Sequence, residues 1–330
     1  MTVWAAIADA LRDHGACMLI SVLSAEGSSP REAGARIVLR PGKRFSGTIG
    51  GGQLEFEAID IGETLLRQGA AGISLRSFAL GPDLGQCCGG RVRLSFEAMG
   101  VSRLAEAEMF AELEAKGRFS VASKVGEDGN VGKRRVIDNA DAPAISLSGG
   151  ELVESFGEDR TPLYLFGAGH VGRALVLSLA PLPFDLTWID SRADAFPKYV
   201  PANCRLVRSA EPAAELGAAP DGAMVLIMTH SHALDQQIAD TALRAGRFTY
   251  VGVIGSKTKR ARMMSRFRAA GLGEEALRTF ACPIGLGTIR SKLPAAIAVS
   301  IAADLLARQE AVSEGTGTVR PLATTNRARQ

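Results

Sequence analysis

Residues 163–190 read LYLFGAGHVGRALVLSLAPLPFDLTWID, and this stretch decides the fold of the second half of the chain. A short apolar run, Leu163 to Phe166, stops at a glycine-rich turn, and an apolar-periodic segment follows up to Ala180. A second β-rich run covers Leu186 to Ile189. Strand, glycine turn, helix and strand in this order predict a Rossmann-type βαβ unit.

The glycine turn has the residue types that a phosphate site needs. Gly167 permits a tight turn, Gly169 lets backbone N–H groups approach a phosphate, and Gly172 lets the helix pack closely on the strand. Asp190 follows at nearly the spacing of an acid that binds a ribose. We therefore expect a ligand at these four residues, and the alternative is a turn that serves packing alone.

Length and composition predict an α/β protein of two domains. A chain of 330 residues with 46% hydrophobic composition can bury a sizeable core. We expect an N-terminal α+β domain over residues 1–100 and a helix, a β-hairpin and a linker over 101–160, the inter-domain connection running from Asp138 to Pro162. A C-terminal Rossmann-like domain with a doubly wound parallel sheet should cover 161–312, and residues 313–330 read as a disordered tail.

Charge and cysteine content limit the classes of function. The net charge is +3 from 38 basic and 35 acidic residues, and aromatic residues make up 5%, which argues against a nucleic-acid partner. No apolar run has the length of a membrane span, and the N-terminus lacks the pattern of a signal peptide. Five cysteines without a C-x-x-C motif indicate a reducing compartment, so we expect a cytoplasmic protein with no membrane partner. Cys17 should be a small core residue.

The sequence GQCCGG at residues 85–90 is the second segment that suggests chemistry. Cys87 and Cys88 have glycines nearby on both sides, whereas a structural cysteine favours apolar neighbours. A soft metal or an electrophile could reach thiols in such a bare turn. Adjacent cysteines rarely form an unstrained disulfide. We therefore expect a functional thiol here.

Three further segments are candidate ligand sites. Gly50, Gly51 and Gly52 precede a predicted helix, so their N–H groups could hold an anion, although a packing turn is the alternative. His230 follows a predicted strand, where ligands of parallel sheets bind, or it lies in a capping loop. Lys257 opens a run of cations at a helix start, which suits a phosphate or a solvated basic face.

Several segments together resemble the XdhC/CoxI family of accessory proteins for molybdenum hydroxylases. The matching stretches are GSSPREAGAR (27–36), GTIGGGQLE (47–55), GQCCGG (85–90), LFGAGHVGRAL (165–175), MTHSHALD (228–235), YVGVIGSKTKR (250–260) and PIGLGTIRSKLPAAIAVSIAADLLA (283–307). The resemblance implies a chaperone rather than an enzyme. Such a chaperone binds the molybdopterin form of the molybdenum cofactor, supports its sulfuration by a cysteine desulfurase, and inserts it into apo xanthine dehydrogenase or a related molybdenum hydroxylase.

Two departures from the family pattern bear on the metal. Gln53 stands where many relatives have cysteine, and Ala296 stands where the pattern has glutamate. The family pattern keeps the cysteine immediately before Gly-Gly, so Cys88 is the better candidate for a molybdenum ligand. The terminal phosphate of the cofactor could lie at residues 50–52, 167–172 or 257–260.

Other functions remain as alternatives. Asp190 followed by Arg192 gives a mixed NAD and NADP signal, so NAD(P) or another nucleotide is a further candidate ligand. The chain could then be an NAD(P)-dependent oxidoreductase with Cys88 or His230 at its centre, or a purely regulatory scaffold for the hydroxylase. We also expect a homodimer.

Overall fold

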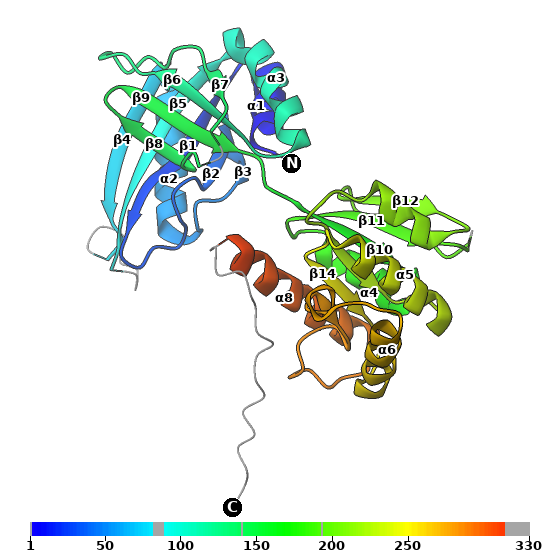
Figure 1. The fold of residues 1–330 in the computed structure, drawn as a ribbon. Coiled ribbons are helices and arrows are strands. Elements are labelled where there is room, and N and C mark those ends of the chain that lie inside the picture. Colours follow the sequence, from blue (N-terminus) through cyan, green and yellow to red (C-terminus); the bar gives the residue numbers. More distant parts are fainter. Residues whose placement is uncertain (1, 82–88, 140, 193, 314–330) are drawn as a thin grey trace, which may run out of the picture. The chain divides into compact units, whose positions relative to one another are not determined.

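The structure, a computed structural model, describes residues 2–81, 89–139, 141–192 and 194–313. The chain divides into two compact units, Met1–Asp159 and Arg160–Gln330 (Figure 1). The tail predicted over residues 313–330 lies outside the described residues except for Ser313, which ends the last helix.

The larger sheet of the first unit is antiparallel and is packed between helices. Alternate residues of its central strand contact opposite layers: Cys17 and Leu19 pack with α1 and α3, whereas Met18 and Ile20 pack with α2. Burial raises the pKa of Cys17 to about 12, so this thiol stays protonated and the predicted core role is confirmed. The strands run in the order β3-β2-β1-β5-β4, with β1 Ala16–Glu26, β2 Arg36–Arg40, β3 Arg44–Gly47, β4 Gly72–Ala79 and β5 Arg91–Gly100, and the helices are α1 Val3–His14, α2 Gly52–Arg67 and α3 Leu104–Lys116.

A second, four-stranded sheet corrects part of the sequence interpretation. The predicted hairpin is present as β6 Phe119–Lys124 and β7 Arg135–Ile137. The expected connection from Asp138 to Pro162, however, contains two more strands, β8 Ile145–Ser148 and β9 Glu151–Phe156, in the order β7-β6-β9-β8. Gly149 and Gly150 both have positive φ, so this pair is a tight hairpin turn rather than part of a linker.

A buried ion cluster connects the two sheets of the first unit. Arg134 is 2% exposed, and its guanidinium donates to Glu97 of β5 at 3.0 Å and to Glu154 of β9 at 2.9 Å. Arg36 lies 3.8 Å from the other oxygen of Glu154, and the Arg134 guanidinium lies 5.3 Å from the centre of the Trp4 ring. Each buried carboxylate therefore has a cation, as buried charge requires.

The second unit has the predicted Rossmann architecture. Its six strands pair in parallel in the order β12-β11-β10-β13-β14-β15, which is the strand order 3-2-1-4-5-6 of dinucleotide-binding folds. The strand order reverses direction between β10 and β13, and ligands of such sheets bind outside the carboxyl ends there. The strands are β10 Thr161–Phe166, β11 Phe184–Asp190, β12 Cys204–Arg208, β13 Met224–Ile227, β14 Tyr250–Val253 and β15 Phe280–Ala281.

Helices cover both faces of this sheet (Figure 1). Leu163 and Leu165 of β10 pack with α4 and α8, whereas Tyr164 and Phe166 belong to the core under η2, α5, α6 and α7. An apolar run buried on both faces is typical of a central parallel strand. The helices are α4 His170–Leu179, η2 Pro212–Ala218, α5 His232–Ala245, α6 Lys257–Ala269, α7 Glu274–Leu277 and α8 Pro294–Ser313.

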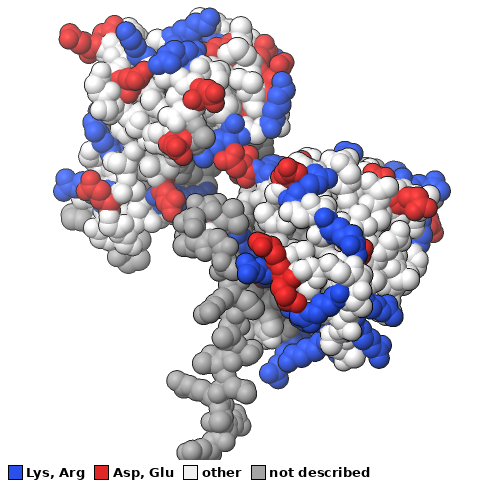
Figure 2. Space-filling view, viewed as in Figure 1, with Lys and Arg blue, Asp and Glu red and all other residues white. Residues whose placement is uncertain are grey.

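Acidic and basic side chains are interspersed on the visible face of each unit (Figure 2). This mixture agrees with the nearly balanced composition of the chain. Among the helices that the structure describes, none is long and apolar enough to cross a membrane.

Candidate functional site

Three of the predicted site residues meet at one small pocket in the second unit. Gly167 follows β10, Asp190 ends β11 and His230 follows β13, and all three line this strand-end pocket. The remaining lining residues are Phe166, Ile189, Ser191, Pro212, Thr229 and Leu234. The pocket thus lies at the carboxyl ends of the strands where their order reverses, the usual ligand position of this fold.

The glycine turn beside the pocket has the geometry that its sequence predicts. Gly167 has φ +109°, and a Cβ there would lie 2.3 Å from the carbonyl oxygen of Met228. A Cβ at Gly172 would lie 2.3 Å from the Gly167 carbonyl oxygen, so this glycine permits close packing of α4. Gly169 is exposed, and a Cβ there would meet no atom within 4 Å. The turn is therefore closed by two glycines and open to a ligand at the third.

Asp190 is not placed as a free ribose acceptor. Its Oδ1 accepts hydrogen bonds from the Arg192 backbone N–H at 2.9 Å and from Arg192 Nε at 3.0 Å. Its Oδ2 accepts from Ala168 N at 2.7 Å and from Arg192 Nη2 at 2.9 Å. Burial alone would raise the pKa of Asp190, but these hydrogen bonds outweigh it and lower the pKa to about 2. The carboxylate is therefore ionised and occupied by the protein itself.

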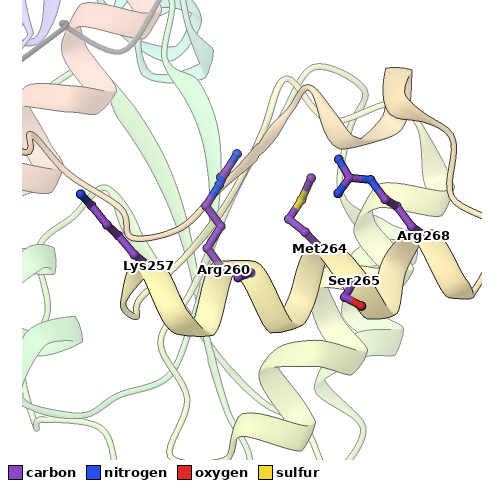
Figure 3. Close-up of a pocket in the computed structure, with 6 residues that line it drawn as sticks. Lys257, Arg260, Met264, Ser265 and Arg268 are labelled. Carbon is purple, nitrogen blue, oxygen red and sulfur yellow. The ribbon is translucent and has the colours of Figure 1, made fainter.

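Lys257 does not line the strand-end pocket but a separate groove. It lines a groove along α6 together with Arg260, Ala261, Met264, Ser265 and Arg268, and Figure 3 shows Lys257, Arg260, Met264 and Arg268 projecting from one side of the helix. Arg260 donates to the Phe280 carbonyl oxygen at 3.2 Å. Of the three cations predicted to form one phosphate cluster, Lys257 and Arg260 therefore share this groove, whereas the third, Lys259, is engaged elsewhere.

A buried ion pair that the sequence interpretation missed holds the loop of His230. Lys259 Nζ lies 2.6 Å from Asp235 Oδ2 and also donates to the Ile254 carbonyl oxygen. Asp235 is 1% exposed, and its Oδ1 accepts from the backbone N–H and the hydroxyl of Thr229. The signal that could have revealed this pair was an acid in the first turn of α5, where a carboxylate can reach the preceding loop.

In the first unit, the glycine run at residues 50–52 already holds an anion of the protein. Glu55 Oε2 accepts from the Ile49 N–H at 3.1 Å, the Gly51 N–H at 3.2 Å and the Thr48 hydroxyl at 2.6 Å. Glu55 lies in the first turn of α2, where a carboxylate is favoured by the helix dipole. A phosphate bound to these same N–H groups would have to displace Glu55.

Replacing Glu55 by alanine should therefore destabilise this turn. We expect the free energy of unfolding to fall by about 1–3 kcal/mol, because three donors lose their acceptor. Urea denaturation followed by circular dichroism measures the change. Glu57→Ala, an exposed acid two residues farther along α2, is the matched control and should change stability by less than about 0.5 kcal/mol. Equal effects of the two substitutions would contradict the capping role.

Three segments that are distant in the sequence meet near this turn. A Cβ at Gly50 would lie 2.6 Å from Pro30 Cβ and 3.3 Å from Arg31 Cγ. A Cβ at Gly90 would lie 2.4 Å from the Ser28 carbonyl oxygen. The loop 27–34 therefore contacts both the glycine run 50–52 and the glycines that end the GQCCGG segment, and we name this group the glycine-loop cluster.

The two adjacent cysteines immediately precede Gly89 and Gly90 in the chain. Cys87 and Cys88 lie outside the described residues, and Gly90 follows Cys88 by two positions. Among the described residues, no three His, Cys, Asp or Glu side chains form a group that could hold a metal ion. The sequence interpretation missed Arg31 as a candidate, although it lies within the loop; its side chain is exposed, and no described residue pairs with its guanidinium.

Models of known protein families match both units of the chain. A model described as the XdhC and CoxI family matches residues 10–78, and a model described as the XdhC Rossmann domain matches residues 163–305. An Escherichia coli K12 protein described as uncharacterized protein YqeB is 30% identical over 151 residues, which are 44% of this chain. The match spans only 27% of the length of YqeB.

A solved structure has the same overall fold. A Bacillus halodurans crystal structure described as a xanthine dehydrogenase superposes with a TM-score of 0.75. The superposition covers 94% of this chain and 96% of that one, at 19% sequence identity. At that identity the likeness concerns the fold alone.

Proposed function

Because the chain belongs to the XdhC and CoxI family, we propose that it serves the maturation of xanthine dehydrogenase or a related molybdenum hydroxylase. In this role it carries the molybdopterin form of the molybdenum cofactor as cargo, supports sulfuration by a cysteine desulfurase, and inserts the cargo into the apo-hydroxylase. The observation that carries the proposal is the glycine-loop cluster, since it brings three motifs of the first unit into contact.

The cluster, together with the cysteines that precede Gly89 in the sequence, suits a cargo with a soft metal and a terminal phosphate. A thiolate is a soft ligand, which matches molybdenum that is already held by dithiolene sulfur, and Cys88 is the thiol that we assign to it. Arg31 supplies a cation whose forked N–H groups match a phosphate. The Gly51 N–H already donates to Glu55 and the Gly50 N–H to the Thr48 hydroxyl, so we assign the phosphate to Arg31 rather than to the glycine run.

Replacing Cys88 by serine should sharply reduce the molybdenum that copurifies with the protein. A serine hydroxyl is a harder donor than a thiol and is far less ionised at neutral pH. The measurement is elemental analysis and pterin content of protein purified from molybdenum-replete cells, together with activation of an apo-hydroxylase. We expect at least a tenfold loss of bound molybdenum.

The matched control is the neighbouring thiol, Cys87→Ser, which should cost less. Both variants should keep the melting temperature of the wild type, because neither thiol is expected to pack in the core. Cys88→Ser protein that retains wild-type molybdenum and activates the hydroxylase normally would remove the thiol from the cargo site. A chain that never contains molybdenum or pterin, in any variant, would refute the carrier role itself.

A second candidate function is that of an NAD(P)-dependent oxidoreductase. The strand-end pocket favours it, because an open Gly169 and an exposed His230 lie at the nucleotide position of the fold. This reading requires consumption of a reduced nicotinamide by the purified chain. It predicts that activation of the hydroxylase depends neither on this chain nor on Cys88, which separates it from the carrier role.

A further inference from the structure

We propose that the carboxyl edge of this sheet, where the glycine turn, the strand-end pocket and Arg192 adjoin, binds an adenine nucleotide with a phosphate on its ribose 2′ position, and that Arg192, rather than Asp190, recognises that position. The inference goes beyond the carrier role, because it concerns another ligand in another unit. It stands on the hydrogen bonds of Asp190, the free donors of Arg192 and the open turn at Gly169.

Asp190 and Arg192 lie at the positions that this fold uses to recognise a ribose. In folds with this strand order, the acid that ends the second strand reads the ribose 2′-hydroxyl, and a nearby arginine accommodates a 2′-phosphate. Asp190 ends β11, the second strand of this unit, and lines the pocket. Arg192 is two residues farther along, so both alternatives of the recognition rule are present at one place.

Asp190 has no acceptor position left for a ribose hydroxyl. A carboxylate offers about four acceptor positions. Asp190 uses four, through Ala168 N, Arg192 N, Arg192 Nε and Arg192 Nη2. Its side chain is 4% exposed, and a ribose hydroxyl would have to break one of these charge-assisted hydrogen bonds. Asp190 therefore holds Arg192 in place instead of accepting from the sugar.

Arg192 keeps N–H donors that can bind a ligand. A guanidinium has five N–H groups, and the side chain of Arg192 donates two to Asp190, which leaves three without a partner among the residues that the structure describes. This side chain is 44% exposed, so the free donors can reach a ligand. Arg208, the register partner of Asp190 on β12, adds a second exposed cation at this edge. The hydrogen bonds to Asp190, and to a smaller extent the charge of Asp194, raise the pKa of Arg192, so the guanidinium stays charged.

The N-terminus of α4 can bind the 5′-phosphate of the same nucleotide. The helix α4 begins at His170, and its N-cap Gly169 leaves the approach to the first backbone N–H groups free of side chains. A 5′-phosphate at this helix end and a 2′-phosphate at Arg192 would be held by separate groups. An adenosine with phosphates at both positions matches the two groups together, whereas an isolated phosphate matches only one of them.

Isothermal titration of the full chain with two nucleotides tests the proposal. Adenosine 2′,5′-bisphosphate should bind at least about tenfold more tightly than adenosine 5′-monophosphate, because a charge-assisted pair contributes that much. Arg192→Ala should bring the ratio of the two affinities close to one. The same change frees two acceptor positions on Asp190, so the affinity for adenosine 5′-monophosphate should hold or increase.

Matched variants keep the test decisive. Arg205→Ala removes an exposed arginine from β12 away from its carboxyl end and should leave the ratio unchanged. Should Arg192→Ala not fold, Arg192→Gln keeps a donor for Asp190 without the charge and should also abolish the preference. Cys88→Ser should bind both nucleotides like the wild type, so this result is independent of the carrier role.

Four outcomes would overturn the proposal. Equal affinities of the wild type for the two nucleotides would show that the protein does not recognise the 2′-phosphate. A preference that survives in Arg192→Ala would show that Arg192 is not the residue that recognises it. Adenosine 3′,5′-bisphosphate that binds as tightly as the 2′,5′ isomer would refute the ribose position. Inorganic phosphate that displaces the bisphosphate at equal concentration would reduce the pocket to a simple phosphate site.

Discussion

Replacing Arg134 by alanine is expected to lower the free energy of unfolding of the first unit by about 3–5 kcal/mol, because two buried carboxylates lose the cation that donates hydrogen bonds to them and keep only the more distant Arg103 and Arg36. Glu97 and Glu154 have side chains that are 4% and 2% exposed, so water cannot take the place of the guanidinium. The packing of Arg134 over Trp4 is lost as well. Urea denaturation, followed by tryptophan fluorescence and circular dichroism, measures the change.

The adjacent residue provides the control for this prediction. Arg135 pairs with Glu151 at 3.0 Å, but both side chains are exposed. Arg135→Ala should therefore cost at most about 1 kcal/mol. If Arg134→Ala changed stability no more than Arg135→Ala does, the cluster would be a surface-like ion pair, and its proposed role in joining the two sheets would be wrong.

Gly167→Ala should be the most damaging change in the glycine turn, with a loss of about 2–5 kcal/mol. The residue has φ +109°, which a side chain strains, and the new Cβ would overlap the Met228 carbonyl oxygen. Relief of this overlap requires β10 and β13 to move apart, although they pair directly. Thermal and urea unfolding of the purified chain give the magnitude.

Gly169→Ala is the matched control two residues away. Its φ is −75°, and a Cβ would meet no atom within 4 Å, so stability should stay within about 1 kcal/mol of the wild type. The two substitutions add the same methyl group to the same turn. Similar losses for both would contradict the assignment of Gly167 to the fold and of Gly169 to the ligand.

The sequence by itself determined the Rossmann unit, because its signals are local. The run Leu163–Phe166 is apolar at every position, as a strand covered on both faces must be, and the glycines after it can be interpreted one by one. The same reasoning put Gly167 and Asp190 in one site and His230 at the end of another strand, and the structure brings the three together because strand ends in a parallel sheet meet at one edge.

Tertiary structure decided what these residues do. Asp190 has the expected spacing for a ribose acid, but spacing does not say whether its acceptor positions are filled, and Arg192 fills them. In the same way, the glycine run 50–52 predicts an anion, and the Gly51 N–H of this run donates to the side chain of Glu55. The direction of a side chain is set by the residues packed around it, and the sequence alone does not show which residues those are.

Contacts between distant residues were equally beyond the sequence. Arg134 meets Glu97 across 37 positions and Glu154 across 20, and nothing in the pattern around any of them marks the pair. A buried charge is stable only where its partners arrive from other strands. The sequence determined most local elements of this protein, with β8 and β9 as the exceptions, whereas the folded chain alone decided its ion pairs and the glycine-loop cluster, because free energies of burial depend on every neighbour at once.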